Sequence, residues 1–145
     1  MAATNPTGMS RVLRSWTIAL LAALWVTGVI WIVLHCAFAG QSDFGPTPNA
    51  WEPSTLRIHG IIAFFAVFLL GFLTARHVSE TWRWPRKRVS GLTLVTTYAV
   101  LALSGYALYY VTLDSAHTIA ATVHEIIGTA GIFVALIHWL GKSRT

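Results

Sequence analysis

Apolar residues form four long runs along the chain, and charged residues stand at or near the ends of the runs. The runs cover residues 16–39, 58–75, 89–113 and 115–141. Each run is close to or longer than the roughly 18 residues that a helix needs to cross a hydrocarbon core of about 30 Å. A backbone inside lipid must satisfy its own hydrogen bonds, so the runs predict an all-α fold, a four-helix transmembrane bundle. The expected helices cover about residues 15–38, 57–77, 90–112 and 116–140.

Composition agrees with lipid surroundings for these helices. Only 10% of the 145 residues are charged, while 55% are hydrophobic. A soluble bundle would need a polar face on each helix, and the four runs lack one. The letters AFA at 37–39 resemble a signal-peptide cleavage site, but the first run is longer than the roughly 7–15 apolar residues of a signal peptide. We therefore expect one membrane domain over residues 1–145, with an uncleaved first helix.

Basic residues are distributed unevenly among the segments that connect the runs. Nine of the ten Lys and Arg residues precede the first run, follow the second or end the chain, and Arg57 is the exception. Because short loops rich in Lys and Arg stay in the cytoplasm, both termini and the basic loop at 78–89 are expected there. The loop at 40–56 is expected outside and, being rich in Gly, Pro and Ser, irregular. The net charge of +5 follows from this topology and gives no reason to expect a nucleic-acid partner.

Six histidines occur in the chain, and four of them form two regularly spaced pairs. His124 and His138 are fourteen residues apart, which places them within about 40° on one side of a helix and about 21 Å apart. His59 and His77 are eighteen residues apart, or five whole turns and about 27 Å. Both helices run in the same direction, so His59 should meet His124 and His77 should meet His138. Facing imidazoles at two depths predict two bis-histidine haem sites, because haem iron takes an axial ligand on each side.

Spacing alone does not choose the ligand near the start of the fourth helix. Pairing His117 instead of His124 with His138 gives a span of about 31.5 Å and an offset of about 60°. The span between His59 and His77 is about 27 Å, so the span of about 31.5 Å from His117 and that of about 21 Å from His124 differ from it by similar amounts. The single cysteine, Cys36, excludes a thiolate cluster and covalent haem attachment through CxxCH, so the haems should be non-covalent.

Three further residues are candidates for contact with haem. Gly131 lies midway between His124 and His138, where a missing side chain would leave room for a flat cofactor. Glycine also lets membrane helices pack closely, so this reading has an alternative. Arg57 and Arg76 each stand beside an expected ligand, where they could pair with haem propionates or mark the ends of the helix.

Several stretches of the chain resemble known membrane cytochromes. HEIIGTAGIFVALIH at 124–138 resembles the last helix of bacterial cytochrome b561-like proteins. RIHG at 57–60, RHVSETWRWPRKRVSG at 76–91 and LALSGYALYY at 101–110 are similar to the flavinylation-associated cytochrome domain, a four-helix membrane cytochrome. The resemblance covers roughly residues 55–140 and implies a protein of the bacterial cytoplasmic (inner) membrane. It implies two b-type haems with four ligands, namely His59, His124, His77 and His138.

One feature departs from bacterial cytochrome b561. Those proteins take a haem ligand from the cytoplasmic end of the first helix, where RVLRSW at 11–16 has no histidine in this chain. The resemblance therefore assigns that role to His77. Three residues keep more than one reading. His35 is an interfacial residue, a quinone-site residue or a replacement haem ligand, and His117 is an interfacial residue or the alternative ligand. Glu125 is a proton acceptor from quinol or an acid favoured at a helix start.

The leading functional hypothesis is electron transfer between the membrane quinone pool and a periplasmic partner, either a c-type cytochrome or a flavoprotein. The chain has no separate domain for a substrate, so we expect it to be a membrane subunit of a hetero-complex. A second hypothesis is a self-contained, quinone-linked oxidoreductase that acts on a small oxidant such as superoxide. A third is a structural or assembly membrane protein without cofactor.

Overall fold

The computed structural model describes residues 10–78 and 88–140, with His77 and Val78 described by their backbone alone. The elements in chain order are α1 Arg11–Ala37, β1 Gly40–Ser42, β2 Gly45–Thr47, α2 Glu52–Leu73, the π-helix η1 Thr74–Val78, α4 Arg88–Tyr110 and α5 Asp114–Leu140. Four helical segments in these ranges are long and apolar enough to cross a membrane. This confirms the four long helices expected from the apolar runs.

The helices begin at residues that suit a helix start. Ser10 caps α1 by accepting a 3.2 Å hydrogen bond from the Leu13 N–H, which would otherwise lack a partner. α2 begins at Glu52, five residues earlier than expected, because Pro53 is well suited to a first helical turn. Most of the basic loop expected at 78–89 lies outside the described residues.

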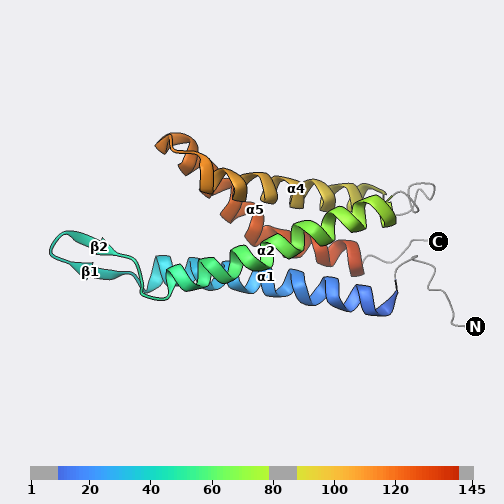
Figure 1. Cartoon of the computed structure of the whole chain (residues 1–145), viewed down its shortest axis with the longest axis horizontal. Coiled ribbons are helices and arrows are strands. Elements are labelled where there is room, and N and C mark those ends of the chain that lie inside the picture. The colour runs from blue at the N-terminus through green and yellow to red at the C-terminus, as the bar shows by residue number, and fades with distance from the viewer. Residues whose placement is uncertain (1–9, 79–87, 141–145) are drawn as a thin grey trace, which may run out of the picture.

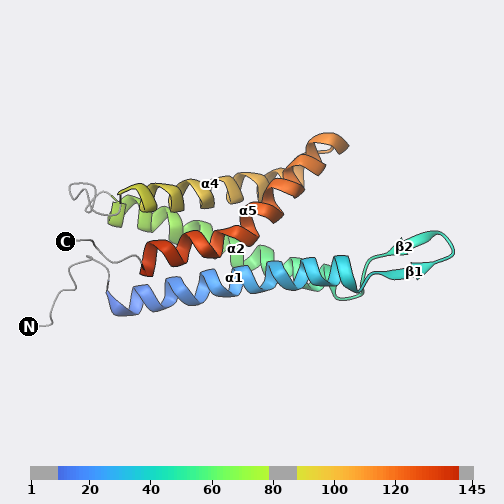
Figure 2. The same ribbon diagram turned by 180° about the vertical axis from the view of Figure 1, so that it is seen from behind.

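The helices form two hairpins that pack into an up-and-down bundle (Figure 1). α1 packs along α2, and α4 packs along α5. The two hairpins contact each other less extensively, through α1 with α5 and through α2 with α4. α2 and α5 therefore occupy opposite corners of the bundle. From behind, α5 runs between α1 and α4 (Figure 2).

A short β-hairpin extends from one end of the bundle, which we call the hairpin end (Figure 1). Gly40 pairs with Thr47 and Ser42 with Gly45, which leaves a two-residue turn. Gly45 has a φ of 110°, a value that favours glycine. The loop at 40–56, expected to be irregular, thus contains a β-hairpin. The sequence did not indicate it, because strands of three residues are too short to show an alternating pattern. At the same end, α4 and α5 lean away from α1 and α2 (Figure 1).

Small residues occupy most of the inside of the bundle. The buried residues of the four helices are Thr17, Glu52, Ala66, Ser104, Gly131 and Ala135. No large side chain in the described part of the chain is fully buried, whereas Phe64 and Phe68 are 72% and 75% exposed. This distribution suits helices in lipid, because large apolar side chains can face the lipid while small ones let helices approach closely.

Candidate functional site

His59 of α2 and His124 of α5 face each other across the bundle. Their ring centres are 6.3 Å apart, and the ring planes are nearly perpendicular, at 81°. A metal–imidazole bond is about 2.0 Å long, so two imidazoles on opposite sides of one metal ion have ring centres about 6 Å apart. The structure thus brings these two candidate ligands together at a separation that suits joint binding of one metal ion.

Two adjacent residues of α1 hold the His59 ring. The Thr27 hydroxyl lies 3.0 Å from His59 Nδ1. A Cβ atom on the next residue, Gly28, would lie only 3.2 Å from His59 Cε1. The hydroxyl therefore fixes one ring nitrogen, while the glycine lets the ring lie against the α1 backbone.

The same arrangement holds the His124 ring in the other hairpin. The Ser104 hydroxyl of α4 lies 2.9 Å from His124 Nδ1. A Cβ atom on Gly105 would lie 3.2 Å from His124 Cε1. Ser104 is buried, so its hydroxyl is available to the histidine and to its own helix rather than to solvent. Each hairpin thus supplies one histidine and, from its other helix, a hydroxyl followed by glycine.

The hydroxyls also determine which ring nitrogen carries the proton. Thr27 Oγ1 is 2.9 Å and 3.0 Å from the carbonyl oxygens of Ala23 and Leu24, and Ser104 Oγ is 2.8 Å from that of Val100. A hydroxyl has one proton, which is directed to these carbonyls, so it accepts a bond from the Nδ1–H of the histidine. In a neutral imidazole the lone pair is then on Nε2, the form that binds a metal.

His138, near the other end of α5, has a similar neighbour on α4. The Ser90 hydroxyl lies 3.2 Å from His138 Nδ1. A Cβ atom on Gly91 would lie 3.5 Å from His138 Cε1. Ser90 and Ser104 are fourteen residues apart on α4, as His124 and His138 are on α5. Because the two helices are antiparallel, Ser104 lies beside His124 and Ser90 beside His138.

Sequence reasoning missed these hydroxyl–glycine pairs. The third helix has no histidine, and no part of either haem site was assigned to it. Its two Ser-Gly dipeptides, at 90–91 and 104–105, repeat the fourteen-residue spacing of the histidines in the fourth helix. That shared spacing is the signal that could have identified α4 as the helix that supports the ligands.

His77 lies in the π-helix η1, and its side chain is outside the described residues. The α-helix expected over 57–77 ends at Leu73. A π-helix closes hydrogen bonds between residues i and i+5, so it holds more residues per turn than an α-helix. The spacing of five whole turns calculated for His59 and His77 therefore does not hold. The pairing of His77 with His138 stays a prediction.

The structure places the other three candidate residues away from the facing rings. Gly131 is buried against α4, since a Cβ atom there would lie 3.7 Å from Thr97 and 3.9 Å from Leu101. This position fits close helix packing, the alternative reading of that glycine. Arg57 is exposed, two residues before His59 and hence about 200° around α2. Arg76 is exposed within η1. Contact of these residues with haem stays a prediction.

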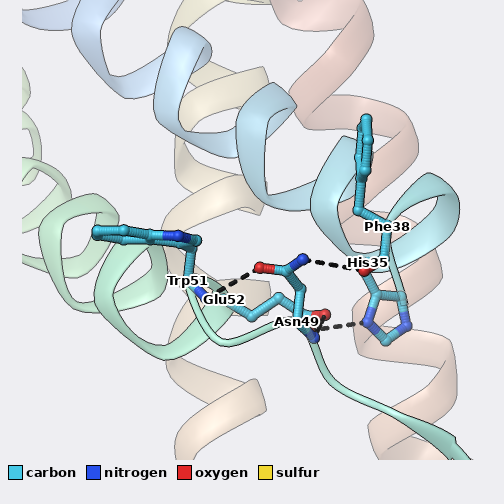
Figure 3. A network of polar contacts seen from close by, with 5 residues as sticks. All are labelled: His35, Phe38, Asn49, Trp51 and Glu52. Atoms are coloured by element: carbon cyan, nitrogen blue, oxygen red, sulfur yellow. Dashed lines mark hydrogen bonds and ion pairs between the residues drawn. The ribbon is translucent and has the colours of Figure 1, made fainter. Parts of the chain in front are cut away.

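A second polar cluster lies at the hairpin end, where it joins α1 to α2 (Figure 3). His35 Nδ1 is 3.1 Å from Glu52 Oε2. The Asn49 backbone N–H donates to Glu52 Oε1 at 2.7 Å, and the Asn49 side-chain amide donates to the Phe38 carbonyl at 2.9 Å. Sequence reasoning had found no partner for His35, and the structure supplies one in Glu52, which is buried. His117 is exposed and takes no part in this cluster.

In the part of the chain that the structure describes, metal-binding side chains meet in pairs, such as His59 with His124. Among the described residues, no three His, Cys, Asp or Glu side chains gather to hold a metal ion. Zinc sites usually take three or four protein ligands, so the facing pair of His59 and His124 does not resemble one.

Comparisons of the chain with protein-family models, with curated proteins and with solved structures find no match. The resemblance to bacterial membrane cytochromes therefore stays a prediction, and the geometry of the histidines carries the functional argument.

Proposed function

We propose that the chain is a di-haem b-type membrane cytochrome. It transfers electrons between the quinone pool and a periplasmic redox partner, as a membrane subunit of a larger complex. The observation that carries the proposal is the facing pair His59 and His124, with ring centres 6.3 Å apart. The Nδ1 atom of each ring is held by a hydroxyl, so each Nε2 is left for iron. Bound haem would supply one-electron redox chemistry.

The number of protein ligands favours haem over other metal sites. An ion held by two imidazoles needs further ligands, and a bound porphyrin would supply them. Gly28 and Gly105 support this assignment, because their missing side chains let each ring stand against its neighbouring helix. A hydrogen bond that orients a histidine through its other ring nitrogen is typical of metal ligands.

A second haem is proposed near the other end of the bundle. His138 has the same kind of hydroxyl and glycine neighbours as His59 and His124. His138 is fourteen residues from His124 on α5, so the two levels are about 21 Å apart. His77 is the ligand that we assign opposite His138, on the basis of the family resemblance.

We propose that all four helices cross the bacterial inner membrane with the hairpin end in the periplasm. α1 begins and α5 ends at the other end of the bundle (Figure 1). The nine cations that lie in the first turn of α1, follow α2 or follow α5 in the sequence would then be at the cytoplasmic end, as the charge rule for membrane proteins requires. The site of His59 and His124 would be the one nearer to the periplasm.

The periplasmic face offers a partner only a weak negative charge. Asp43 and Asp114 are exposed there, whereas Glu52 is buried against His35. Arg57, near the same end, is also exposed. A basic partner would gain little from these charges, which salt screens beyond about 8 Å. We therefore expect electron transfer to a basic c-type cytochrome to slow only modestly as salt rises.

The proposed function predicts that quinol reduces a c-type cytochrome through this chain. The purified protein is placed in lipid nanodiscs, and a short-chain quinol and then a basic c-type cytochrome are added. The cytochrome should be reduced in the presence of the wild-type chain and not of the His124→Ala variant.

Three results would contradict this function. Reduction only by NAD(P)H would exclude the quinol route. Consumption of superoxide without any protein partner would instead support the self-contained oxidoreductase. A colourless protein that binds no added haem would support a structural role.

Ser104→Ala should weaken haem binding at the site of His59 and His124. The variant removes the acceptor for His124 Nδ1–H, and loss of a hydrogen bond that orients a ligating histidine costs about 10–100-fold in metal affinity. Transfer of haem to an excess of apomyoglobin measures the loss. The matched control is Thr93→Val on the same helix, since the Thr93 hydroxyl donates only to the Val89 carbonyl. Equal haem loss from both variants would show that the Ser104 hydroxyl does not orient a ligand.

A further inference from the structure

A histidine–glutamate pair at the hairpin end has no part in the proposed haem sites (Figure 3). His35 Nδ1 lies 3.1 Å from Glu52 Oε2, and the Asn49 backbone N–H binds the other carboxylate oxygen. Trp31 stacks on the His35 ring, with ring centres 4.9 Å apart and planes inclined by 11°. These contacts fix both the position and the orientation of the imidazole.

The pair leaves one nitrogen and one face of the His35 ring open. An ionised carboxylate only accepts hydrogen bonds, so Nδ1 donates to Glu52 and, in the neutral ring, Nε2 is an acceptor. No hydrogen bond to Nε2 is present in the described part of the chain. The His35 side chain is 56% exposed, although Trp31 covers part of it.

The pair lies in line with the His59 site, closer to the hairpin end. Glu52 precedes His59 by seven residues, which is within about 20° of two turns and about 10.5 Å along α2. His35 follows Gly28, which contacts the His59 ring, by the same seven residues. The pair is thus about two helical turns from the nearer proposed haem site along both helices.

The surroundings of His35 indicate a ligand that arrives through the membrane. The apolar span of α1 ends at Ala37, two residues after His35, so the ring lies at the expected depth of the lipid–water boundary. A suitable ligand is flat enough to cover the open imidazole face and carries a hydroxyl that donates to Nε2. An aromatic diol with an apolar tail, a membrane quinol, has this chemistry.

We propose that His35, oriented by Glu52, binds the head group of a membrane quinol. The quinol hydroxyl donates to Nε2, and the ring lies against the open imidazole face. A quinone has carbonyl oxygens and no hydroxyl, so an Nε2 acceptor favours the reduced form. This inference rests on the proposed function and adds the place and the preferred redox state of the quinone-type ligand.

The test measures binding of a fluorescent probe to the full-length protein with its haems in nanodiscs. The probe is a 4-hydroxyquinoline N-oxide with an alkyl tail, which carries an O–H donor in either tautomer, and its O-methyl ether is the matched ligand that cannot donate. The wild-type chain should bind the hydroxyl probe roughly tenfold more tightly than the ether, as the loss of one hydrogen bond implies. In His35→Ala this preference should disappear, because the acceptor is gone. Haem content and reduction by dithionite should stay unchanged.

Two further variants identify the residues responsible. Glu52→Gln should reduce the preference for the hydroxyl probe. The new side-chain amide can donate a hydrogen bond as well as accept one, so Nδ1 need not carry the proton and Nε2 need not be the acceptor. His117→Ala, which removes another exposed histidine of the same end, should leave it unchanged. The competing location is beside Tyr109, whose hydroxyl would lie 3.2 Å from a Cβ atom on Gly60.

The outcomes separate this inference from the proposed function. Equal preference in the wild type and in His35→Ala overturns the His35 site, as does a preference lost in Tyr109→Phe and kept in His35→Ala. In both cases a wild-type chain that quinol reduces would still support the proposed function. A wild-type chain without haem would overturn that function, and the quinol site with it.

Discussion

Replacing His124 with Ala should lower the haem content of the purified protein from two per chain to one. His124 faces His59 at a ring separation of 6.3 Å, and the variant leaves that site with one imidazole. The Ser104 hydroxyl would also lose the Nδ1–H from which it accepts a hydrogen bond. The haem held by His138 should remain, because that residue is about 21 Å away on α5. A pyridine-haemochrome assay combined with protein quantitation measures the ratio.

His117→Ala is the matched control for this variant. Spacing in the sequence allowed either histidine to be the ligand, but His117 is exposed and lies seven residues closer to the hairpin end. The control should therefore retain two haems per chain and the spectrum of the wild type. Two haems in His124→Ala and one in His117→Ala would show that the family resemblance had identified the wrong ligand. One haem in the wild-type chain would remove the site of His138.

The sequence predicts the features of the fold that depend on repeating patterns. The four long helices follow from apolar runs, because both length and polarity of a membrane-spanning helix are restricted by the bilayer. The meeting of His59 with His124 could be expected because the residues lie at corresponding heights on helices that run the same way. Their separation could not be predicted, since it depends on how the two hairpins pack.

Other features depend on local geometry that a periodic pattern does not record. The π-helix η1 changes the number of residues per turn just before His77, so counting by 3.6 residues fails there. The burial of Glu52 depends on its hydrogen bonds to His35 and Asn49, which come from both sides of the β-hairpin. Sequence distance gives no indication of either contact.

The arrangement around the facing histidines is nearly equivalent in the two hairpins. Thr27 and Gly28 support His59, while Ser104 and Gly105 support His124. In each case a hydroxyl accepts from Nδ1 and the following glycine lies against Cε1. An imidazole held from one side by a neighbouring helix can direct Nε2 away from that helix. If haem binds between the two hairpins, each hairpin would thus supply an equivalent imidazole to hold it.

Replacing Gly105 with a larger residue should remove the haem expected between His59 and His124. An added Cβ atom would lie 3.2 Å from His124 Cε1, so the ring would have to move by a few tenths of an ångström. The ring has little freedom to do so, because the 2.9 Å bond to Ser104 holds Nδ1, the atom next to Cε1. Gly105→Ala should therefore weaken haem binding, and Gly105→Leu should reduce the content from two haems per chain to one.

Two other glycines provide controls of graded severity for this prediction. A Cβ atom on Gly71 would meet nothing within 4 Å, so Gly71→Ala should retain both haems. The fold of this variant should be no less stable, because alanine favours helices by about 0.5–1 kcal/mol over glycine. Gly91→Ala brings a Cβ atom to 3.5 Å from His138 Cε1, an ordinary contact that should cost less haem than Gly105→Ala. Haem-to-protein ratios after dialysis, with the thermal unfolding midpoint of each variant, measure these differences. A Gly105→Leu variant that keeps two haems and an unchanged spectrum would show that the His124 ring does not need to lie against α4 in order to bind haem.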